Sequence, residues 1–135
     1  EHVALINDVE FINDSKATNI DAVIVAINTF KKPIVLILGG YDKGANFRLL
    51  LPHIKSSHVR DIVSYGDAGG QINTDLGDAV RSVLVTDLNS AVKKAQSMAA
   101  PGDIILLSPG CASFDEFSNF EERGNYFKSI VGTYK

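Results

Sequence analysis

The sequence predicts a three-layer α/β domain built on a mostly parallel sheet of about six strands. Apolar runs alternate along the chain with segments of helical periodicity, and the connections between them are short. The run Pro33 to Leu38 is apolar throughout, which is typical of a parallel strand that is buried on both faces. Polar loops that carry glycine and other small residues follow the strands.

The elements follow one another in the order strand, loop, helix. Val9 to Ile12 is predicted as a short strand, and after a polar loop Ile20, Val23 and Ile27 recur at helical spacing. Pro101 and Gly102 stop a later helix. The remaining expected strands are 33–38, 61–65, 82–85 and 103–107, and the remaining expected helices are 47–54, 89–99 and 119–133.

Composition narrows the class of protein. The chain has 135 residues, 45% hydrophobic and 21% charged, as in an ordinary globular domain. Its net charge is −3 and no block of basic residues occurs, so we expect no nucleic-acid partner. The apolar runs are far shorter than the roughly 20 residues of a membrane span. One cysteine and no signal-peptide pattern are typical of the cytoplasm.

Residues 1–135 are therefore expected to form one domain. The first residue is Glu1 and the only methionine is Met98, so we expect the chain to be a piece of a longer protein.

The polar loops are expected at one edge of the sheet, beyond the carboxyl ends of the strands, where open parallel sheets bind ligands. They span 13–19, 39–46, 66–70 and 108–115. In the last of them an apolar strand ends in small residues and is followed by a helix start that carries Asp115 and Glu116. Small residues let backbone N–H groups approach a ligand and a helix N-terminus favours anions, so a negatively charged ligand is expected.

Several single residues in these loops have a functional and a structural interpretation. Lys43 follows two glycines, where it could bind a carboxylate or phosphate or be a solvated surface lysine. Asp14 and Lys16 could contact a ribose and a phosphate, or only each other and water. Thr18 and Asn19 could bind a ligand or cap a helix.

Other residues favour the structural interpretation. Cys111 is expected to be a small, half-buried thiol and not a nucleophile, because every histidine is more than fifty positions away in sequence. The histidines show no metal-ligand spacing. Most of four phenylalanines at intervals of three and seven are expected in the core: Phe114, Phe117, Phe120 and Phe127. Neither nucleotide fingerprint, G-x-x-x-x-G-K-[ST] or G-x-G-x-x-G, is present.

Taken together, the loops resemble the C-terminal, Rossmann-like domain of the Mur ligase family, in its D-glutamate-adding branch. The resemblance covers most of the chain, although Val3 stands where that branch usually has an arginine. Its motifs occur in the order of the family: Asn13–Asn19 (NDSKATN), Gly39–Lys43 (GGYDK), Leu107–Phe117 (LSPGCASFDEF) and Asn119–Asn125 (NFEERGN).

The resemblance implies an ATP-dependent, amide-forming ligase of bacterial peptidoglycan synthesis, which adds D-glutamate to UDP-N-acetylmuramoyl-L-alanine through an acyl phosphate. The family divides this work among three domains. The phosphate-binding loop and the Mg²⁺ ligands belong to the central domain, and the uridine nucleotide binds to the N-terminal one. We therefore expect this fragment to be inactive alone, to work with its own N-terminal and central domains, and to be monomeric.

The resemblance also implies roles for particular residues. Lys43 and Thr18 would bind the α-carboxylate of D-glutamate. The hydroxyl of Ser113 and the backbone near Phe114 and Phe120 would bind its side-chain carboxylate. The ATP ribose and phosphates would meet two further residues, Asp14 and Lys16.

Two alternatives have the same α/β alternation. A receiver-type signalling domain would need clustered acids after its early strands and a lysine after the fifth, where this chain has Ser108-Pro109-Gly110. A stand-alone domain that senses a nucleotide or an amino acid is the other alternative. A G-x-x-x-x-G-K-[ST] motif upstream of Glu1 would favour the ligase over that sensor.

Overall fold

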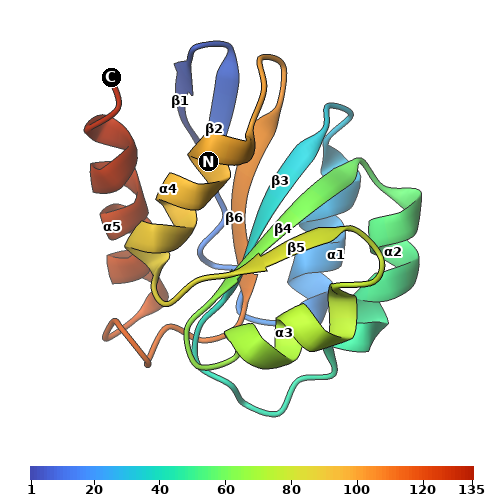
Figure 1. Ribbon diagram of the computed structural model, residues 1–135. Coiled ribbons are helices and arrows are strands. Elements are labelled where there is room, and N and C mark those ends of the chain that lie inside the picture. Colours follow the sequence, from blue (N-terminus) through green and yellow to red (C-terminus); the bar gives the residue numbers. More distant parts are fainter.

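The computed structural model describes residues 1–135 and contains one six-stranded sheet with helices on both faces (Figure 1). The strand order across the sheet is β1-β2-β6-β3-β4-β5. Only the edge pair of β1 and β2 is antiparallel, and all other neighbours are parallel. The strands are β1 (His2–Ile6), β2 (Val9–Asn13), β3 (Ile34–Gly39), β4 (Val59–Tyr65), β5 (Arg81–Leu84) and β6 (Ile104–Gly110).

The helices form the two outer layers. The helices α1, α2 and α3 and the short 3-10 helix η1 cover one face, and α4 and α5 cover the other (Figure 1). No helix combines the length and the apolar character that crossing a bilayer requires. The helices are α1 (Ile20–Thr29), η1 (Phe47–Leu50), α2 (Leu51–Ser56), α3 (Gly69–Leu76), α4 (Leu88–Met98) and α5 (Phe120–Gly132).

The central strand β3 supplies both cores because its side chains alternate between the two faces. Ile34, Leu36 and Leu38 pack under α1, α2 and α3. Val35 and Ile37 pack under α4 and α5. Every residue of the strand is buried, which explains why its sequence is one continuous apolar run without polar alternation.

The topology brings three loops together. Strand β6 lies between β2 and β3, although it is the last strand of the chain. The connection through α1 therefore passes over β6 on one face, while α4 leads from β5 back to β6 on the other. The carboxyl ends of β2, β6 and β3 consequently lie side by side, at the position where parallel sheets of this kind bind ligands.

The predicted fold class is confirmed, and the elements differ from the prediction in a few places. Residues 2–6 form the edge strand β1, which the sequence pattern does not predict. Residues 69–76 form α3, so the predicted loop over 66–70 ends in a helix. The predicted helix 47–54 begins as the 3-10 turn η1.

The segment after β6 differs most. The strand continues through Gly110, and the following residues form turns in which Glu116 and Phe117 donate backbone N–H groups to the Ser113 carbonyl. The helix begins only at Phe120, with Asn119 as its N-cap. The expectation of a helix start at the carboxylates of this loop is therefore wrong.

The expectation that most of the four phenylalanines lie in the core is also wrong. Phe127 is fully buried on α5, whereas Phe114 is 63% exposed and Phe120 is 39% exposed. The intervals of three and seven predict a shared buried face only within a helix, and the segment 111–119, which contains Phe114 and Phe117, is not a helix. Cys111, expected to be half-buried, is only 4% exposed.

Candidate functional site

Three loops, 14–19, 40–46 and 111–119, follow β2, β3 and β6 and are joined to one another by backbone hydrogen bonds. The Gly110 N–H donates to the Ala17 carbonyl at 2.8 Å, which ties the first loop to β6. The Tyr41 N–H donates to the Ala112 carbonyl, also at 2.8 Å, which ties the second loop to the third. The loops therefore form one connected rim above the sheet.

A small cleft of about 230 Å³ opens in this rim. It is smaller than the roughly 300 Å³ at which pockets for drug-sized ligands begin, so its size suits a small metabolite. All five residues that the resemblance assigns to D-glutamate line it. The full lining is Thr18, Lys43, Ala112, Ser113, Phe114, Asn119, Phe120 and Glu121.

Three polar side chains of this cleft, Thr18, Lys43 and Ser113, are available to a ligand. Lys43 is exposed and forms no ion pair, Thr18 is half-buried, and Ser113 is buried at 2% exposure. None of these three side chains forms a hydrogen bond within the chain. One ammonium and two hydroxyls are thus available to a ligand, a set that suits carboxylates.

The first turn of α5 forms another wall of the cleft. Asn119 caps this helix by accepting a hydrogen bond from the Glu122 N–H at 2.8 Å. Phe120 opens the helix, and its exposed side chain lies at the cleft. Backbone N–H groups at a helix start carry partial positive charge, which adds to the attraction of this cleft for an anion.

An aromatic pair marks the outer edge of the cleft. The rings of Tyr41 and Phe114 meet edge to face, with centroids 6.2 Å apart and an interplanar angle of 72°. Both side chains remain substantially exposed. A larger neighbouring cleft of about 400 Å³ shares Thr18 and Lys43 with the small one, so these two residues stand at the junction of two hollows.

Asp14 and Lys16 lie in a third cleft, of about 500 Å³, whose walls are mostly apolar. The carboxylate of Asp14 accepts a hydrogen bond from the Ser108 hydroxyl at 2.9 Å and forms no ion pair with Lys16. Phe30 on the helix side and Leu106 on the sheet side contribute apolar surface. The single segment 14–18 therefore contributes to two clefts, with Asp14 and Lys16 in one and Thr18 in the other.

The structure adds a residue that sequence reasoning missed. Arg123 on α5 is completely buried, and its guanidinium donates to Ser15 and to the Cys111 carbonyl. One feature of the sequence points to Arg123. It lies three residues after Phe120 and four before Phe127, on the apolar stripe of the helix. A charged residue on such a stripe predicts a buried, fully bonded side chain.

Cys111 has the properties of a structural thiol. Burial raises its pKa to about 12, with the positive charge of Arg123 opposing the shift and nearby carboxylates adding to it. His58 immediately precedes β4 and so lies at the opposite end of the sheet. No group of three or more His, Cys, Asp or Glu side chains is placed to hold a metal ion.

Comparison with known proteins gives consistent matches. The family described as "Mur ligase, glutamate ligase domain" matches residues 1–111. The chain is 45% identical over 131 residues to the UDP-N-acetylmuramoylalanine–D-glutamate ligase of Bdellovibrio bacteriovorus, covering 97% of this chain and 28% of that protein. The ligase of the same name from Chlamydia caviae is 45% identical over 132 residues, covering 98% of this chain and 31% of the relative.

A solved structure supports the fold. A domain from a Haemophilus ducreyi protein, described as a UDP-N-acetylmuramate:L-alanyl-gamma-D-glutamyl-meso-diaminopimelate ligase, superposes with a TM-score of 0.55, covering 97% of this chain and 98% of that one. The sequences are 14% identical, so this similarity concerns the fold alone. The chain spans less than a third of the length of the two ligases above.

Proposed function

Because this chain belongs to the Mur ligase family, we propose that it is the C-terminal domain of the bacterial ligase that adds D-glutamate to UDP-N-acetylmuramoyl-L-alanine in peptidoglycan synthesis. The observation that carries the proposal is the 230 Å³ cleft, in which one ammonium, two free hydroxyls and a helix N-terminus surround a space suited to a small anion. A dicarboxylic amino acid needs such groups held apart at its own length.

Each end of D-glutamate is assigned to a different wall. From the resemblance to the family, the Lys43 ammonium and the Thr18 hydroxyl are assigned to the α-carboxylate, and both residues line the cleft. The Ser113 hydroxyl and the backbone near Phe114 and Phe120 bind the side-chain carboxylate, close to the start of α5. Holding both carboxylates leaves the amine free and fixes the direction from which it can attack.

We assign the ATP contacts to the cleft that contains Asp14 and Lys16. The Asp14 carboxylate is suited to accept hydrogen bonds from ribose hydroxyls, and the Lys16 ammonium is suited to phosphate. ATP supplies the phosphoryl group that converts the substrate carboxylate into an acyl phosphate. Because segment 14–18 contributes to both clefts, the activated carboxylate and the amine of D-glutamate would be held close to each other.

The rest of the active site is assigned outside this chain. The phosphate-binding loop and the Mg²⁺ ligands belong to the proposed central domain, and the uridine nucleotide to the N-terminal one. The fragment alone is therefore proposed to lack ligase activity. From the resemblance to the family, we also propose that the complete enzyme is a cytoplasmic monomer. Phosphate release by the purified fragment, given ATP and both substrates, would contradict this division of labour.

The proposal is tested by the amino-acid selectivity of the complete, three-domain protein. Phosphate release from ATP is measured with UDP-N-acetylmuramoyl-L-alanine and one of three amino acids: D-glutamate, L-glutamate or D-aspartate. D-glutamate should support turnover. D-aspartate is one methylene shorter, and its kcat/KM should be about 10- to 200-fold lower than that of D-glutamate. Equal kcat/KM values for D-glutamate and D-aspartate, or turnover that needs no amino acid, would refute the assignment.

A further inference from the structure

Arg123 is buried in a way that stability alone does not explain. Its side chain is completely inaccessible to solvent, yet all three of its hydrogen bonds go to neutral oxygen atoms. No carboxylate lies within ion-pair distance of its guanidinium. Burying a charge without an opposite charge is costly, and an apolar side chain of similar size would often serve the core at least as well.

The hydrogen bonds of Arg123 hold two separate loops. Nε donates to the Ser15 hydroxyl at 2.9 Å and Nη2 donates to the Ser15 carbonyl at 2.7 Å. Nη1 donates to the Cys111 carbonyl at 2.9 Å. The Ser15 hydroxyl in turn donates to the Phe120 carbonyl at 2.7 Å, which ties the first loop to the start of α5.

Every one of these anchor points is close in sequence to a wall of the 230 Å³ cleft. Ser15 precedes Thr18 by three residues, and Cys111 precedes Ser113 by two. Phe120 itself lines the cleft. One guanidinium therefore fixes the three segments that carry three of the proposed D-glutamate contacts.

The surrounding backbone leaves room for this side chain. A Cβ on Gly40 would lie 3.1 Å from Nη1 of Arg123 and 2.4 Å from the Ala112 carbonyl oxygen. A Cβ on Gly124 would lie 2.9 Å from the Asn13 amide and 3.3 Å from the Ser15 Cβ, so this glycine lets α5 approach the first loop. Glycines at both positions thus permit the close packing of α5, the loops and the guanidinium.

We propose that Arg123 is a positioning residue for the amino-acid site, which sets the distance between the Thr18 wall and the Ser113–Phe120 wall. This inference rests on the proposed function. The planar guanidinium presents its donors in a fixed fork, so it can bridge Ser15 and Cys111 with one geometry. A lysine keeps the charge but is a flexible point donor and cannot maintain that spacing.

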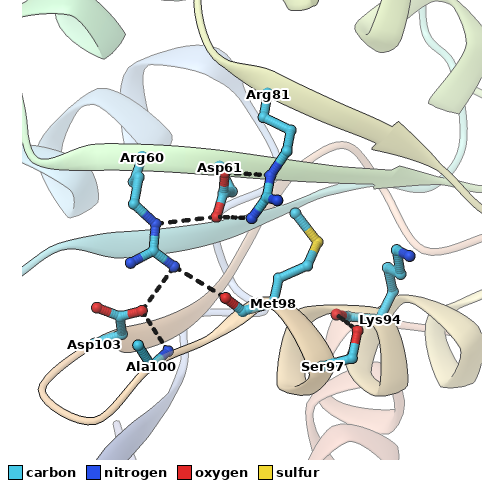
Figure 2. A network of polar contacts seen from close by, with 8 residues as sticks. All are labelled: Arg60, Asp61, Arg81, Lys94, Ser97, Met98, Ala100 and Asp103. Atoms are coloured by element: carbon cyan, nitrogen blue, oxygen red, sulfur yellow. Dashed lines mark hydrogen bonds and ion pairs between the residues drawn. The ribbon is translucent and has the colours of Figure 1, made fainter.

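The test compares Arg123→Lys with Arg60→Lys in the complete ligase. Arg60 is a suitable control because it also joins separate segments through hydrogen bonds, at the amino ends of the strands (Figure 2). Its guanidinium contacts Asp61 at 3.1 Å, Asp103 at 2.7 Å and the Met98 carbonyl at 3.1 Å. Both variants should lower the midpoint of thermal unfolding, since both disturb a network of hydrogen bonds.

Only Arg123→Lys should raise the KM for D-glutamate, by about tenfold or more, because misplaced binding groups lose most of their contribution. The KM for the UDP precursor should stay unchanged in both variants. Ser15→Ala provides a milder second variant, which removes the acceptor of Arg123 Nε and the donor to the Phe120 carbonyl but keeps the two backbone contacts of the guanidinium. It should raise the same KM by a smaller factor.

The outcomes separate the two proposals. If wild-type enzyme uses D-glutamate and neither Arg123→Lys nor Ser15→Ala changes its KM more than Arg60→Lys does, the positioning role is refuted and the proposed function stands. If Arg123→Lys does not fold, an unchanged KM in Ser15→Ala refutes the role by itself. If the wild-type enzyme does not use D-glutamate, both proposals fail.

Discussion

Lys43 and Arg123 contribute to the 230 Å³ cleft in different ways, because Lys43 lines it whereas Arg123 bonds to the loops that carry its walls. Lys43 is exposed on a loop and bonds to no other group of the chain. The next residue, Gly44, has a positive φ of 80°. Arg123 is buried and bonded to backbone on both sides. The mobile ammonium is suited to contact a ligand directly, whereas the fixed guanidinium is suited to shape the space around it.

Cys111 is expected to be dispensable for catalysis. Burial holds its pKa near 12, so the thiol stays protonated at neutral pH, and an acyl phosphate needs no enzyme nucleophile. Cys111→Ala in the complete ligase should keep most of kcat/KM, with a small loss in thermal stability from the methyl-sized cavity. A folded variant that binds both substrates but loses activity by several powers of ten would require a covalent mechanism.

At the scale of elements, the sequence predicts the inner strands and most helices, and it misses the edge strand β1 and helix α3. The unbroken apolar run of β3 identifies a buried strand, because both faces of it are core. Helix α3 (Gly69–Leu76) escapes prediction because it begins with two glycines and buries only Ile72 and Leu76 among its larger side chains. Tertiary packing and not local propensity stabilises it.

The site is predictable only in part from sequence. The loops that follow β2, β3 and β6 can be identified, because glycines and small polar residues interrupt apolar runs there. Their mutual approach depends on β6 lying between β2 and β3, which no local pattern encodes. The role of Arg123 also depends on contacts 12 and 108 residues away, so only its unusual place on an apolar stripe gives a signal.

The N-cap of α5 offers a prediction at the same scale. Asn119→Ala should cost about 1 kcal/mol of unfolding free energy, as is usual for N-cap removal, and should raise the KM for D-glutamate because it loosens the helix start at the cleft. Asp87 caps α4 by accepting a hydrogen bond from the Ser90 N–H. Asp87→Ala should therefore cost a similar unfolding free energy without changing the KM for D-glutamate. Both quantities come from thermal unfolding and steady-state kinetics of the same preparations. Equal KM changes in the two variants would show that α5 contributes no more than general stability.

At the scale of the whole molecule, the two ends of the sheet have different roles. The carboxyl ends carry clefts with unpaired polar groups, whereas the amino ends are joined by a network of ion pairs (Figure 2). Asp61 at the start of β4 accepts from Arg81 at 2.9 Å and from Arg60 at 3.1 Å. Arg60 extends the network to Asp103, just before β6. This network stabilises the end of the sheet opposite the 230 Å³ cleft.

The ion pairs of Asp61 predict how the free energy of unfolding depends on pH. Burial by itself would raise the pKa of Asp61, but the hydrogen bonds from Arg81 and Arg60 outweigh it and hold the pKa below the ordinary aspartate value. A group whose pKa is lowered by folding stabilises the protein above its unfolded pKa, and this contribution is lost as the pH falls through about 4 toward the lower folded value.

Asp61→Asn should therefore lower the unfolding free energy at pH 7 by about 1–3 kcal/mol and make its decline between about pH 5 and pH 3 shallower. Asp78→Asn is the control, because Asp78 is exposed and has no partner in the chain. Denaturant titrations at several pH values measure both variants. A parallel acid decline in wild type and Asp61→Asn would contradict the assigned pKa shift.

The account depends most on Lys43, and the binding of D-glutamate to the complete ligase tests it most directly. Kinetics of wild type, Lys43→Ala and Lys94→Ala are measured as a function of D-glutamate concentration; Lys94 is an exposed lysine on α4 that lines none of the clefts described above. Removing a charged hydrogen bond to a carboxylate costs roughly 2–5 kcal/mol, so Lys43→Ala should lose about 30- to several thousand-fold in kcat/KM for D-glutamate, with Lys94→Ala unchanged. Values of KM and kcat in Lys43→Ala equal to those of wild type would show that Lys43 is a solvated surface residue and that the 230 Å³ cleft is not the D-glutamate site.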